Sequence, residues 1–164
     1  MWGLMIICYL FMALSFVLVS ITGLQSYFEF NIFSANYQQF ALFSTIFYMF
    51  SQTLIMFYFI GSGTAIKKEV SILDSKTDAY EKVKKSKMIL FPHLTLNMFF
   101  MGTAFILIGA VDTGSVSSLI QSIIFLCAYF HFIYSIRIQH IGFKDNINLV
   151  IELAKINQVK SVIN

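Results

Sequence analysis

The sequence predicts an all-α integral membrane protein in which four transmembrane helices form one antiparallel bundle. Three observations lead to this fold class. First, 58% of the 164 residues are hydrophobic and only 12% are charged, whereas a soluble domain is about half apolar and about a quarter charged. Second, four windows each supply the roughly 20 mostly apolar residues that a helix needs to cross a bilayer. Third, almost all of the charge lies outside these windows.

The four predicted spans are separated by more polar segments. They cover residues 3–24, 40–60, 88–111 and 117–138. The first is expected to be retained, because the N-terminus lacks the positive region of a secretory signal and its apolar run exceeds the usual ~7 to 15 residues. One bundle accounts for the length, so residues 1–164 are predicted to be a single domain. The domain also includes a lysine-rich loop at 62–87 and a polar tail at 139–164.

The distribution of positive charge predicts the orientation of the bundle. Every Lys and Arg lies in the loop between the second and third spans or at and beyond the end of the fourth: Lys67, Lys68, Lys76, Lys82, Lys84, Lys85, Lys87, Arg137, Lys144, Lys155 and Lys160. The positive-inside rule places both regions in the cytoplasm, and an even number of spans then places both termini there. The abundance of Lys, Ile, Asn and Phe suggests an AT-rich genome. The bacterial inner membrane is therefore the expected location, with an organellar membrane as the alternative.

Both predicted cytoplasmic segments carry helical patterning. In the loop, Ile66 and Val70 recur at helical spacing, which indicates a short amphipathic helix after a break at residues 61–63. In the tail, one apolar face is expected, formed by Ile147, Val150, Ile151 and Ala154. That face fits either a membrane surface or a partner, and packing on the protein's own loop is the alternative.

Two histidines are the candidate ligands for a metal or haem. His93 lies about two turns or less inside the cytoplasmic face of the third span, at a rise of ~1.5 Å per residue, and His131 lies at the same depth in the fourth. These two spans are joined by a tight turn, so they are predicted to be antiparallel neighbours with level imidazoles. Such a pair suits axial ligation of a b-type haem, or a metal ion with His140 as a third ligand. The alternative is a structural role, with hydrogen bonds to head groups, water or a neighbouring tyrosine.

A polar pair is predicted deeper in the bundle. Gln52 of the second span and Asn97 of the third both lie about ten residues from the cytoplasmic face, so a hydrogen bond between them is expected. Such bonds contribute about 0.6 to 2 kcal/mol in membranes. The spans have no acidic or basic residue at mid-depth, which argues against an ion-coupled transporter.

No catalytic signature accompanies these residues, so enzymatic activity of the chain on its own is not expected. The first functional hypothesis is an accessory or structural subunit of a larger membrane protein complex, such as a respiratory-type electron-transfer assembly. The alternatives are a b-type haem-binding anchor or electron carrier that uses His93 and His131, and an oligomeric channel or small-solute transporter. The expected partners are the lipid bilayer and other membrane subunits. Nucleic acid is not expected, because the lysines do not interleave with aromatic residues.

Overall fold

The computed structural model is all-helical and describes residues 2–28, 30–31, 35–73 and 79–163. Its helices are α1 (Trp2–Phe28), α2 (Tyr37–Leu73), α3 (Ala79–Asp112) and α4 (Ser118–Ile163). Within the described residues, all four are long and apolar enough to cross a membrane. Each contains one predicted span, except that Ser117 of the fourth span precedes α4. The all-α class and the presence of four such helices are confirmed.

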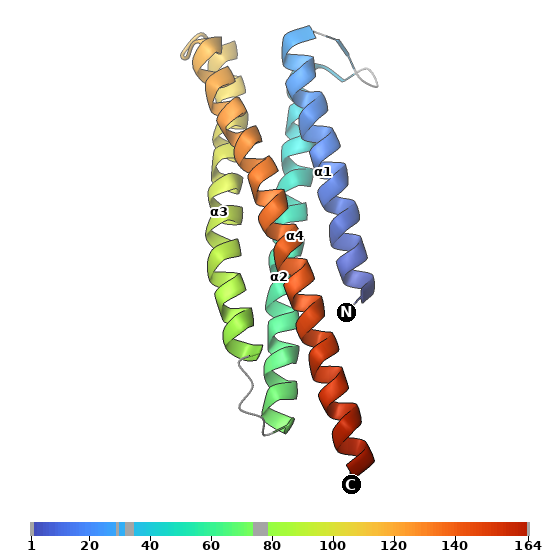
Figure 1. Ribbon diagram of the computed structural model, residues 1–164. Helices are drawn as coiled ribbons and strands as arrows, with labels where there is room; N and C mark the ends of the chain where they lie inside the picture. The colour runs from blue at the N-terminus through green and yellow to red at the C-terminus, as the bar shows by residue number, and fades with distance from the viewer. Residues whose placement is uncertain (1, 29, 32–34, 74–78, 164) are drawn as a thin grey trace.

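Successive helices run in opposite directions along the long axis of the molecule (Figure 1). The most extensive contacts join α3 to α4 and α1 to α2, while α2 also contacts α3 and α4. The connection between α3 and α4 is tight because Gly114 takes a φ of 70°, a conformation that glycine adopts without steric cost. This turn makes α3 and α4 antiparallel neighbours.

Buried residues recur every three or four positions along the helices. In α4 they are Gln121, Ala128, Phe132, Ser135, Gln139, Gly142, Phe143, Asn146, Leu149 and Leu153. In α1 they are Met5, Cys8, Met12, Ser15, Val19, Thr22 and Gln25. Alternating steps of three and four give a seven-residue repeat, which is the pattern of helices packed in a left-handed bundle. One face of α4 therefore contacts the other helices from its start almost to its end.

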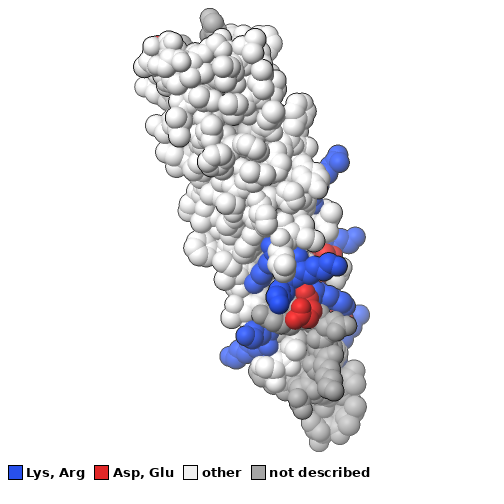
Figure 2. All heavy atoms as spheres, turned by 90° about the vertical axis from the view of Figure 1, so that its left-hand side faces the viewer, with Lys and Arg blue, Asp and Glu red and all other residues white. Residues whose placement is uncertain are grey.

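Charged residues gather at one end of the bundle. We call residues 61–73, 79–87 and 141–163 the lysine-rich end. Figure 2 shows charged side chains on this part of the molecule and an almost uncharged surface over the rest of the visible face. An apolar cluster of Ile66, Val83, Leu149 and Leu153 joins α2, α3 and α4 there. Lys76 of the predicted loop lies outside the described residues.

The expected break in the second helix is wrong. α2 continues without interruption through residues 61–63 to Leu73. Ser62 and Gly63 are buried in the helix contacts: Asn146 of α4 donates to the Ser62 hydroxyl at 2.5 Å, and the side chains of Lys87 and Val83 from α3 lie over Gly63. The small residues serve close packing between helices, so they do not end α2.

The predicted apolar face of the tail is correct in part. Ile147 and Val150 are partly buried against the apolar clusters, whereas Ile151 and Ala154 are exposed and Leu149 and Leu153 are buried in their place. The reason is that the seven-residue repeat of the preceding span continues into the tail and decides which side of the helix faces α2 and α3. The tail packs on the protein's own segment 62–87, which was the alternative to a membrane surface or a partner.

Candidate functional site

The structure brings His93 of α3 and His131 of α4 side by side. Their ring centroids lie 5.7 Å apart, with the ring planes inclined by 37°. Both side chains are only partly buried. Tyr134, which is 52% exposed, forms a T-shaped ring contact with His93, with centroids 5.3 Å apart. The histidine pair therefore lies toward the outer face of α3 and α4.

A hydrogen-bonded chain from the bundle interior orients His131. The fully buried Asn97 donates from Nδ2 to the Tyr48 hydroxyl at 2.6 Å, and its Oδ1 lies 3.0 Å from His131 Nδ1. Because an amide oxygen only accepts hydrogen bonds, Nδ1 of His131 carries the proton and Nε2 keeps its lone pair. Histidines that bind metals are usually oriented by such a second hydrogen bond. His131 is thus arranged to act as a ligand through Nε2.

The spacing of the two rings can be compared with that required to ligate haem iron. Two imidazoles on opposite sides of one iron, each with a metal–nitrogen bond of ~2.0 Å, have ring centroids about 6.3 Å apart. The centroids of His93 and His131 are 5.7 Å apart, so the two rings would have to separate to hold a haem between them. Among the residues that the structure describes, no three His, Cys, Asp or Glu side chains are grouped to hold a metal ion. Two protein ligands suffice for haem iron, whereas a structural zinc site needs four.

His140 does not join this pair. Its Nδ1 is hydrogen-bonded to the hydroxyl of Tyr9 at 2.8 Å, which ties α4 to α1. The expected role of His140 as a third ligand is therefore not supported by its position. It serves instead as a matched comparison for the other two histidines.

Gln52 and Asn97 make hydrogen bonds with other residues of α2 and α4 rather than with each other. Gln139 donates from Nε2 to Gln52 Oε1 at 2.8 Å, while Asn97 pairs with Tyr48 and His131. The expected Gln52–Asn97 bond is absent from the described contacts of these two residues. Gln139 could have been predicted as the partner of Gln52 from its position on the seven-residue repeat of α4. Comparing the depths of residues in the membrane was not enough to identify it.

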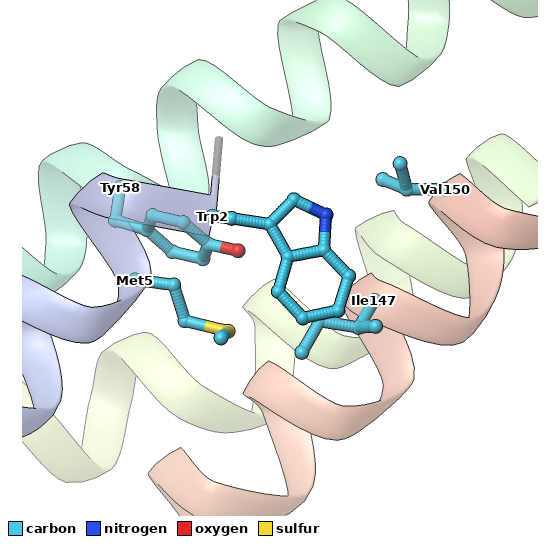
Figure 3. A pocket seen from close by; sticks show the side chains of 5 residues that line it. All are labelled: Trp2, Met5, Tyr58, Ile147 and Val150. Carbon is cyan, nitrogen blue, oxygen red and sulfur yellow. The ribbon is translucent and has the colours of Figure 1, made fainter.

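Two hollows lie near the lysine-rich end. In the first, of about 10 Å³, Trp2 of α1 faces Ile147 and Val150 of α4, with Met5 and Tyr58 alongside (Figure 3). This volume is at the lower limit for one water molecule. The second is an open groove of about 440 Å³ between α3 and α4, lined by Lys82, Lys85, Ser86, Ile89, Asp145, Asn148, Leu149 and Glu152. Neither hollow combines oriented ligands as the histidine pair does.

Comparison of the chain with models of known protein families, with curated proteins and with solved structures finds no match. The candidate site therefore rests on the residues and their geometry alone.

Proposed function

We propose that the protein is a small membrane subunit of an electron-transfer assembly and that His93 and His131 ligate the iron of a b-type haem. The observation that carries this proposal is the side-by-side placement of the two rings, with His131 oriented by Asn97. Haem is favoured over a bare metal ion because two axial imidazoles are all that the protein must supply.

The exposure of the site indicates where the haem would lie. Behind His131 the interior is filled by the fully buried rings of Tyr48 and Phe132, which contact each other edge to face at 4.9 Å. The histidine rings are partly buried and Tyr134 is exposed, so His93 and His131 would hold a haem toward the outer side of α3 and α4. A partner subunit could cover a site that faces outward, which is in keeping with a role as one subunit of an assembly.

A structural subunit without a cofactor is the second candidate. It is favoured by the large apolar side chains exposed on all four helices, among them Leu10, Phe57, Phe99 and Phe130. Such a surface suits contacts with lipid and with other membrane helices. A channel or transporter within one chain is disfavoured, because apolar clusters interrupt the buried polar residues along the bundle.

We also propose that the lysine-rich end, with both chain termini, faces the cytoplasm of a bacterial inner membrane. The support is the gathering of Lys and Arg beside the apolar spans, which the positive-inside rule associates with the cytoplasmic side. The histidine pair would then lie near the cytoplasmic face.

An optical spectrum of the protein purified from its native membrane tests the haem proposal. We expect a Soret band and an α band in the reduced-minus-oxidised spectrum, and we expect both bands to be lost in His93→Ala and His131→Ala variants that still elute as folded protein. His140→Ala is the matched control and should keep both bands, because His140 is bonded to Tyr9. A wild-type protein without the bands would leave the structural subunit as the function. Bands that persist in both variants would refute the ligand assignment.

A further inference from the structure

A buried polar layer crosses the bundle between two apolar clusters. The cluster nearer the lysine-rich end includes Met12, Ile55, Leu94 and Phe143. The other includes Val19, Tyr48, Met101 and Phe132. Each helix contributes one of the four named residues to each cluster, and buried polar side chains lie between these two positions in the sequence of every helix. They are Ser15 in α1, Ser51 and Gln52 in α2, Asn97 in α3, and Ser135 and Gln139 in α4. The order of residues along each helix thus places these six, which we call the polar layer, at one level.

Five atoms of the polar layer have no hydrogen-bond partner among the residues that the structure describes. They are Ser15 Oγ, Ser51 Oγ, Gln52 Nε2, Ser135 Oγ and Gln139 Oε1. Each of these side chains belongs to a residue that is at most 1% exposed. Leaving a buried donor or acceptor unpaired costs the full desolvation penalty of the group. Five such atoms from three helices, at one level, indicate a bound molecule that pairs with them.

The types of these atoms identify the class of molecule. Gln52 Nε2 only donates and Gln139 Oε1 only accepts, while the serine hydroxyls do both. A metal cation would meet the donating amide of Gln52, and an anion would meet the carbonyl oxygen of Gln139. Neither ion would find a compensating charge, since none of the six side chains is charged. Water fits because a single molecule both donates and accepts.

We propose that the polar layer is a closed site for ordered internal water. The water would accept from Gln52 Nε2, donate to Gln139 Oε1, and pair with the hydroxyls of the three serines. A buried water typically makes about three hydrogen bonds to otherwise unpaired groups, and the polar layer supplies five. This site is separate from the haem proposal, since none of its five unpaired atoms belongs to His93, His131 or Asn97.

A separate cavity in the same bundle is large enough for water. It has a volume of about 20 Å³ and is lined by Thr22, Ser44 and Tyr48 but by none of the six residues of the polar layer, and one water needs about 10 to 15 Å³. The Thr22 and Ser44 hydroxyls are hydrogen-bonded to each other at 2.9 Å beside that cavity. Polar groups and unfilled volume therefore occur together in the interior of this bundle.

Serine-to-alanine substitution tests the water site through the sign of a stability change. A hydroxyl bonded to water supports the fold, so Ser51→Ala and Ser135→Ala should each lower the melting temperature of the full-length protein in detergent. Ser44→Ala is the matched control with a known partner, Thr22, and should lower it as well. If the hydroxyls of the polar layer are instead unpaired, their removal relieves a penalty and raises the melting temperature. A rise in both variants would overturn the proposal.

A high-resolution structure of the full-length protein gives the same test directly. At least one ordered water is expected within hydrogen-bond distance of Gln52 Nε2 or Gln139 Oε1. A dry layer with the serine hydroxyls bonded to carbonyls of their own helices would refute the site. Neither result depends on whether haem is bound.

Discussion

The lysine-rich end and the middle of the bundle differ in the make-up of their cores. At the lysine-rich end the core is largely apolar, with Leu149 and Leu153 at its centre and one buried polar pair, Ser62 and Asn146, and most charged side chains are exposed. In the middle, Gln52 and Gln139 are buried while large apolar residues such as Phe130 are exposed. The hydrophobic effect joins helices only where water surrounds them, whereas helices in lipid associate through close packing and hydrogen bonds. The change of core chemistry along one set of helices supports water around the lysine-rich end and lipid around the middle.

The largest effect is expected from shortening a side chain in the apolar core of the lysine-rich end. Leu149→Ala should cost about 2 to 5 kcal/mol of local stability, because it removes apolar contacts and leaves a cavity. Limited trypsin digestion in detergent would measure this through faster cleavage at the exposed lysines of that end. Ile151→Ala is the control, since Ile151 is 41% exposed on the opposite side of α4. Equal cleavage rates for the two variants would show that an apolar core around Leu149 does not stabilise the lysine-rich end.

A smaller effect is expected from removing a hydrogen bond in the middle of the bundle. Gln139→Leu introduces an apolar side chain of similar size. The substitution leaves Gln52 Oε1 without its hydrogen-bond donor. The expected loss in the free energy of unfolding is about 0.6 to 2 kcal/mol, as for other polar contacts in membranes. Reversible unfolding in mixed micelles would measure it, with Cys127→Leu on the exposed side of α4 as the control. A gain in the stability of Gln139→Leu would contradict this difference between the two regions, because it would show that an apolar core stabilises the middle of the bundle as well as the lysine-rich end.

The sequence predicted the helices well and their contacts less well. Apolar windows of sufficient length identified all four helices, since a chain in lipid must satisfy its backbone within each span. Equal depth and a short connection placed His93 beside His131, and their ligation stays a prediction. The partner of Gln52 and the buried face of the tail were missed, because both depend on how α4 is rotated against α2 and α3. Ala128, Ser135, Gly142 and Leu149 follow a seven-residue spacing that is present in the sequence. A search for apolar residues alone does not detect it, because the pattern continues from the apolar span into the polar tail.

Electron paramagnetic resonance of the oxidised protein, purified from its native membrane, tests the histidine site most directly. If His93 and His131 both ligate haem iron, the wild type should give a low-spin ferric signal, because two axial imidazoles form a strong ligand field. In His131→Ala the signal should become high-spin or disappear, while His140→Ala should match the wild type. A wild-type protein without a ferric haem signal, or with a high-spin signal alone, would contradict ligation by both histidines.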